Sequence, residues 1–68
     1  MKSVEYRNCA VIFQDTENKY YVSLYYSDGY QYFIEKGNCV VLYKTLKGAE
    51  KACKKYGYTD IRYKIANN

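Results

Sequence analysis

The sequence predicts an α+β fold: an antiparallel sheet of four to five strands with one helix packed on one face, in the order β-β-β-β-α-β. Polar and apolar residues alternate over 19–27 and 61–65, which is typical of strands. Over 45–56 the apolar residues instead recur three and four positions apart, which is typical of a helix. A chain of 68 residues has room for one core, so we expect residues 1–68 to form a single domain.

The first two strands are predicted from an apolar run and an alternating run. Within residues 4–13, the stretch CAVIF at 9–13 indicates a strand with little water on either face. Residues 14–19, QDTENK, are predicted to form a polar loop. The second strand then covers 19–27, where apolar and polar positions alternate.

The turn sequence SDG at 27–29 sets the register of the hairpin that follows. A three-residue loop ending in Gly29, in the left-handed region, pairs Tyr26 with Tyr30 and groups apolar residues on one face. A two-residue loop would place Glu35 on that apolar face, so we predict the three-residue loop. The face that we expect the helix to cover, with tyrosines at its rim, then holds Val22, Leu24, Tyr26, Tyr30, Tyr32 and Ile34.

Two further strands are predicted on either side of the helix. The turn signal at 36–38, Lys-Gly-Asn, leads into a short strand over 39–43. After the helix, apolar residues at every second position predict a last strand over 61–65. The sheet would therefore receive strands from both ends of the chain.

The helix has start and stop signals. Thr45 is a good N-cap, and Gly57 stands where a glycine commonly ends a helix. Glu50 is one turn before Lys54, a spacing that allows an ion pair. The residues expected to pack on the sheet are Leu46, Ala49, Ala52, Cys53 and Tyr56.

Composition argues against an enzyme, a metal site and a membrane segment. The chain has no histidine, and its three cysteines, Cys9, Cys39 and Cys53, form no CxxC pair. Each cysteine lies in an apolar context, so we expect all three to be reduced and buried. No apolar run approaches the ~20 residues that span a bilayer, and residues 1–10 lack the apolar segment of a signal peptide. We expect a cytoplasmic, non-enzymatic protein without a cofactor or a metal.

Positive charge is concentrated in the second half of the chain, with a net charge of −1 over 1–34 and +5 over 35–68. On the polar face of the helix this charge would attract a phosphate backbone or an acidic protein. The alternative is the solvated face that any amphipathic surface helix presents. Lysine in place of arginine indicates attraction between point charges. The candidate basic residues are Lys44, Lys47, Lys51, Lys54, Lys55, Arg62 and Lys64.

Three aromatic residues on the uncovered sheet face, Tyr21, Tyr25 and Phe33, form a second candidate surface. Aromatic residues on an exposed sheet stack on bases in several RNA-binding modules. Uncharged aromatic patches are equally typical of the centre of a protein interface. A further alternative is that the N-terminal strand or a second copy of the chain covers them, giving a homodimer in the latter case. Because Glu35 shares this face and no RNP-type motif is present, we favour contact with a protein.

The segment TLKGAEKACKKYGY, residues 45–58, follows the tyrosine-rich strands and resembles small phage and mobile-element proteins, several anti-CRISPR proteins among them. The resemblance implies a cytoplasmic, single-domain inhibitor that docks on a protein or ribonucleoprotein complex of host defence. Many such inhibitors are acidic mimics of nucleic acid, whereas this chain has a net charge of +4. We therefore expect docking on an acidic protein surface or near bound nucleic acid. The alternative is a nucleic-acid-binding module.

Overall fold

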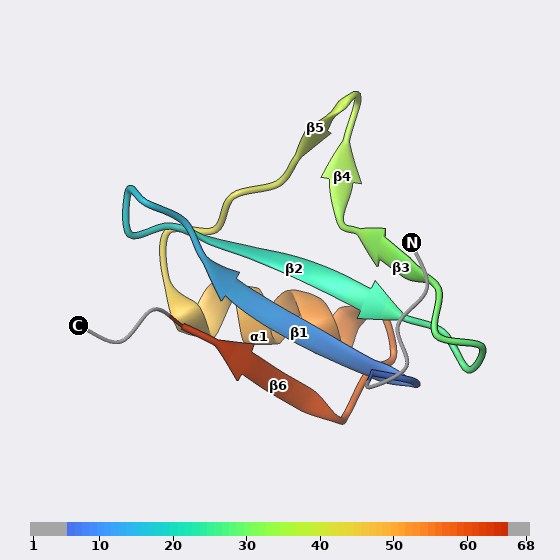
Figure 1. Cartoon of the computed structure of the whole chain (residues 1–68). Coiled ribbons are helices and arrows are strands. Elements are labelled where there is room, and N and C mark those ends of the chain that lie inside the picture. The colour runs from blue at the N-terminus through green and yellow to red at the C-terminus, as the bar shows by residue number, and fades with distance from the viewer. Residues whose placement is uncertain (1–5, 66–68) are drawn as a thin grey trace.

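The computed structural model describes residues 6–65 and shows an α+β fold with one helix (Figure 1). A four-stranded sheet has the order β3-β2-β1-β6, and a two-stranded hairpin, β4-β5, extends away from its β3 edge. The helix lies across one face of the large sheet, and the other face is free of helix. The elements are β1 Cys9–Gln14, β2 Tyr20–Tyr25, β3 Gln31–Phe33, β4 Glu35–Lys36, β5 Cys39–Val40, α1 Leu46–Lys55 and β6 Ile61–Lys64.

The predicted register of the hairpin between β2 and β3 is confirmed. Leu24 lies opposite Tyr32. The N–H of Tyr26 donates to the carbonyl oxygen of Tyr30, with an N···O distance of 3.0 Å. Gly29 has a φ of 89°, which is the left-handed conformation that the three-residue loop requires. Asp28 stabilises this turn, because its Oδ1 accepts from the N–H of Tyr30 at 3.0 Å.

The prediction of an entirely antiparallel sheet is wrong, because β6 runs parallel to β1, with Val11 opposite Arg62 and Phe13 opposite Lys64. The connection that leads to β6 contains α1, which crosses one face of the sheet. This connection lays β6 along the side of β1 that faces away from β2, where β6 becomes an edge strand. A crossover through a helix allows such a parallel pair. The sheet is therefore mixed, with antiparallel pairing among β1, β2 and β3.

The predicted strand 39–43 is only partly a strand, and it does not join the large sheet. Its first two residues pair with β4 instead, with Cys39 opposite Lys36. The tight turn between them has Gly37 at a φ of 65°, and it folds the chain directly back on β4. The far end of the predicted strand keeps one isolated bridge to the sheet, from Tyr43 to Tyr20.

Both predicted ends of the helix are confirmed. Thr45 is extended and its Oγ1 accepts from the N–H of Gly48 at 3.0 Å. At the other end Gly57 has a φ of 88°, and the N–H of Tyr58 donates to the carbonyl oxygen of Cys53 at 3.0 Å, as in a Schellman motif. The expected ion pair from Glu50 to Lys54 is not among the ion pairs of residues 6–65. Glu50 instead accepts a hydrogen bond from the hydroxyl of Tyr63 on β6, and this bond raises the pKa of Tyr63.

The main core lies between α1 and the sheet. Ala49 and Cys53 of α1 are fully buried, and their small side chains let the helix approach the strands closely. The predicted rim tyrosines Tyr26, Tyr30 and Tyr32 remain 46–48% exposed, because α1 packs on β2 and β1. The buried residues of this core are Ala10, Ile12, Val22, Leu24, Ile34, Ala49 and Cys53.

Candidate functional site

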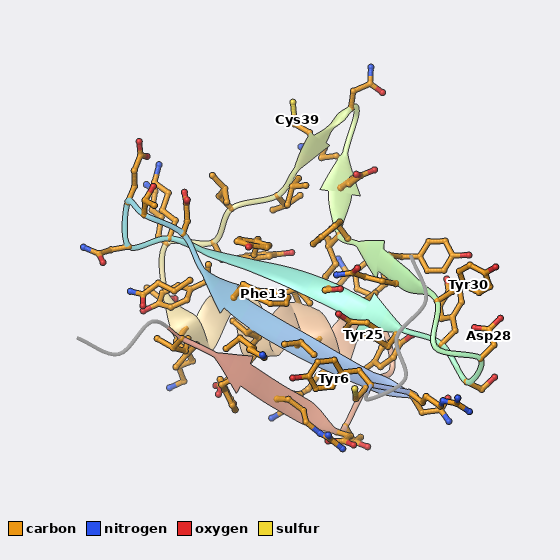
Figure 2. All side chains as sticks on the ribbon, viewed as in Figure 1. Tyr6, Phe13, Tyr25, Asp28, Tyr30 and Cys39 are labelled. Atoms are coloured by element: carbon orange, nitrogen blue, oxygen red, sulfur yellow. The ribbon has the colours of Figure 1, made fainter. Side chains whose placement is uncertain are left out.

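The sheet face opposite α1 divides into a covered half and an exposed half. The covered half is a second small core in which Cys9 and Val11 are fully buried and Tyr25 is 5% exposed. Tyr6 packs over it, with its ring centroid 5.2 Å from that of Tyr25 (Figure 2). The prediction that Tyr25 faces outward uncovered is therefore wrong, since Tyr6, which precedes β1, packs over its ring.

Arg62 belongs to the covered half of this face and not to the basic face of the helix. Its guanidinium lies 5.9 Å from the ring centroid of Tyr6. It also donates two hydrogen bonds to the carboxylate of Asp60, at 3.3 and 3.1 Å, and these bonds raise the pKa of Arg62. Lys64 lies opposite Phe13, so it too is on the sheet face away from α1. The structure thus separates these two cations from the helix lysines with which the sequence grouped them.

The exposed half carries a row of aromatic rings that crosses three strands. Phe13 and Tyr21 are stacked, with centroids 5.1 Å apart and ring planes inclined by 14°. Tyr21 in turn lies 6.0 Å from Phe33. Phe33 is 40% exposed, so two of the three predicted aromatic residues, Tyr21 and Phe33, lie together on this half of the face.

This row continues onto the β4-β5 hairpin and forms a shallow hollow there. Val40 and Leu42 are 37% and 44% exposed and stand beside Phe33. The hollow has a volume of about 360 Å³, and we call it the apolar hollow; it is lined by Asp15, Tyr21, Phe33, Val40 and Leu42.

Sequence reasoning missed Val40 and Leu42. They belong to an unbroken apolar run, residues 39–43, which hides the alternation that marks an exposed face. Only the structure shows that Val41 and Tyr43 pack against the main core, so that Val40 and Leu42, which alternate with them, face away from it.

The helix lysines form a separate surface on the other side of the sheet. Lys47, Lys51, Lys54 and Lys55 recur at helical spacing on the side away from Ala49 and Cys53, and we call them the lysine stripe. All four are exposed, as is Lys44 before the helix. The ion pairs within residues 6–65 involve other cations: Lys19 with Glu17 at 3.9 Å, and Arg62 with Asp60 at 3.1 Å.

Two of the three free cysteines are buried as expected. Burial raises the pKa of the Cys53 thiol to about 11, and it also raises the pKa of the Cys9 thiol. The expectation that Cys39 is buried is wrong. Cys39 follows the turn of the β4-β5 hairpin and is exposed near its tip, away from both cores (Figure 2).

Within residues 6–65, no three His, Cys, Asp or Glu side chains are grouped so that they could hold a metal ion. Over the same residues, α1 is too short and too polar to cross a membrane. The candidate surfaces are the apolar hollow and the lysine stripe, on opposite sides of the sheet. No protein-family model, curated protein or solved structure matches the chain.

Proposed function

We propose that the chain is a small binding protein that docks on a protein surface through the apolar hollow. The observation that carries this proposal is that Phe33, Val40 and Leu42, which are 37–44% exposed, surround one hollow. A contiguous apolar patch on a small protein gains free energy when a partner covers it. Its aromatic and aliphatic lining resembles the centre of a protein interface, where most of the binding energy is concentrated.

The fixed position of the aromatic rings supports docking without rearrangement. Tyr21 is held from one side by its stacking on Phe13 and lies on β2, which is hydrogen-bonded to strands on both sides. Its partner in the hollow, Phe33, ends β3 and is aligned with Ser23 of β2. Side chains that are already ordered lose little conformational entropy on binding.

The form of docking that we propose is inhibition of a bacterial defence complex of the CRISPR type. Its support is the resemblance of residues 45–58 to small phage and mobile-element proteins. An inhibitor that acts by occupying a surface needs an exposed patch and no reacting group. The apolar hollow is such a patch, and it would dock on a protein or ribonucleoprotein partner.

Phe33→Ser is expected to weaken capture of the partner at least about tenfold, because it removes an aromatic anchor from the apolar hollow. The measurement is affinity capture from a bacterial lysate, followed by titration of the captured protein against the wild type and the variant. Tyr32→Ser is the matched control. Tyr32 precedes Phe33 on β3 and is similarly exposed, at 48%, but faces the other side of the sheet.

We expect Tyr32→Ser to bind within about threefold of the wild type, since a residue outside the contact contributes little. Equal losses for the two variants would show that the apolar hollow is not the interface. The identity of the captured protein tests the proposed inhibition separately. A component of a defence complex supports it, and a partner unrelated to defence contradicts it.

A second candidate function, binding to nucleic acid, is favoured by the lysine stripe. Four exposed lysines without an ion pair among residues 6–65 can neutralise about four phosphates. Binding to duplex DNA should then be weak and electrostatic, and its affinity should fall about 100-fold between 50 and 200 mM salt. Lysines give no bidentate contact with base edges, so little sequence preference is expected.

We expect the triple variant Lys47→Glu, Lys51→Glu and Lys55→Glu to lose this binding, measured by fluorescence anisotropy with a labelled 20-base-pair duplex. Replacing the three residues by glutamine is the control that removes charge without adding repulsion, and it should give an intermediate affinity. A triple glutamate variant that binds as the wild type does would leave the stripe as an ordinary solvated face.

A further inference from the structure

We propose that the occupant of the apolar hollow is a basic segment of a partner protein, in which a bulky apolar side chain is flanked by lysine or arginine. This inference rests on the proposed docking function and names the chemistry of the partner. It follows from the charged groups at the border of the hollow, which differ in sign from the net charge of +4.

Asp15 supplies the first carboxylate, since it lines the apolar hollow itself. Its Oδ1 accepts from the N–H and the hydroxyl of Thr16, at 2.7 and 3.3 Å, which fixes the side chain within its own turn. It forms none of the ion pairs found within residues 6–65. A carboxylate that is fixed in position beside an apolar surface can pair with a cation whose neighbouring group is apolar.

Glu35 supplies the second carboxylate. It lies directly opposite Val40 in the β4-β5 hairpin. Residues opposite each other in an antiparallel pair point to the same face, so Glu35 stands beside the wall that Val40 contributes to the hollow. Glu35 is exposed, and it too is absent from the ion pairs of the described chain.

The nearby cations lie outside the lining of the hollow. Lys36 lies opposite Cys39, which puts it on the other face of the hairpin. Lys19 is opposite Asp15 along the backbone, but its ammonium group lies 3.9 Å from the carboxylate of Glu17. Lys64, opposite Phe13, is on the same sheet face but does not line the hollow. The residues that line the apolar hollow include no lysine or arginine. The lining of the hollow is therefore acidic, although the protein as a whole is basic.

This local charge selects among the possible occupants. A phosphate or an acidic segment in the hollow would meet the carboxylate of Asp15 in the lining and that of Glu35 beside it, and be repelled. A basic segment gains both attraction to the carboxylates and burial of its apolar side chain. Arginine is the better of the two cations, because its guanidinium can also stack on the faces of Tyr21 and Phe33.

The test is selection from a random dodecapeptide library on the immobilised wild-type protein. Enriched peptides should combine an aromatic residue or leucine with lysine or arginine within three positions. Their affinity should fall at least about tenfold for Phe33→Ser. It should fall about five- to tenfold for the double variant Asp15→Asn and Glu35→Gln, in which the carboxamide oxygen introduced by Asp15→Asn can still accept from Thr16. Circular dichroism checks that each variant is folded.

The outcomes that overturn the inference differ from those that overturn the docking function. Peptides that depend on Phe33 but lack cations, or that bind the double carboxamide variant as well as the wild type, refute a basic occupant and leave docking at the hollow intact. Failure to select any peptide that depends on Phe33 also refutes a basic segment as the occupant, whereas docking at the hollow is decided by lysate capture with Phe33→Ser and Tyr32→Ser. A concentration-dependent dimer in sedimentation experiments that Phe33→Ser abolishes would identify the occupant as a second copy, which also overturns the inference.

Discussion

Ile12→Ala is expected to lower the free energy of unfolding by about 3 kcal/mol. Ile12 has the largest side chain among the fully buried residues. It lies in the middle of β1, opposite Val22 of β2 and Tyr63 of β6, and it faces α1. Truncation there leaves a cavity. The neighbouring strands and the helix could close it only by moving together, so most of the cavity remains.

The loss is large relative to the whole stability of the domain. A chain of 68 residues is expected to have about 3–10 kcal/mol of unfolding free energy, so the variant would lie near its threshold. Urea unfolding followed by circular dichroism measures the change. Ile65→Ala is the matched control, because Ile65 is only partly buried against the same core, and it should cost about 1 kcal/mol. Equal costs would contradict the position of the core.

The parts of the fold that sequence predicts correctly are those set by local signals. The turn that ends in Gly29 fixes the register of β2 and β3, because a slip by one residue would exchange the two faces. Thr45 and Gly57 fix the ends of α1 through the backbone groups that a helix leaves unpaired. Each of these signals acts within a few residues, so one sequence is enough to interpret it.

The parts that the sequence does not predict depend on contacts between distant segments. No feature of residues 61–64 themselves indicates that they pair with β1, or whether the pairing is parallel or antiparallel. The same holds for Tyr6, whose position over Tyr25 joins residues far apart in the chain. The turn at Gly37 is local, but whether Cys39 then pairs with β4 or with the large sheet depends on competing tertiary contacts.

The candidate site, like the fold, was predicted only where local sequence patterns determine it. Tyr21 and Phe33 follow from the alternation of β2 and β3 and lie together as that alternation implies. Val40 and Leu42 lie on an arm whose placement is a tertiary result, so the apolar hollow could not be foreseen from strand periodicity. The acidic border of the hollow also depends on this arm, since Glu35 reaches it through the hairpin.

Tyr25→Ala is expected to lower the free energy of unfolding by about 3 kcal/mol, even though strand periodicity places Tyr25 on the same sheet face as Phe33. Tyr25 is 5% exposed and forms the second core with Cys9 and Val11, beneath Tyr6. Loss of its ring removes the contact with the Tyr6 ring at 5.2 Å and exposes the two small residues to water. Urea unfolding at pH 7 measures the change.

Phe33→Ala is the matched control on the exposed half of the same face, and it should cost less than about 1 kcal/mol because 40% of the residue is already in water. Tyr25→Phe keeps the ring and should retain most of the stability, which separates packing from any effect of the hydroxyl. The contrast decides how the face is used: a buried half stabilises the fold, and an exposed half is free to bind. If Phe33→Ala cost as much as Tyr25→Ala, both rings would belong to the core, and the patch on which docking depends would not exist.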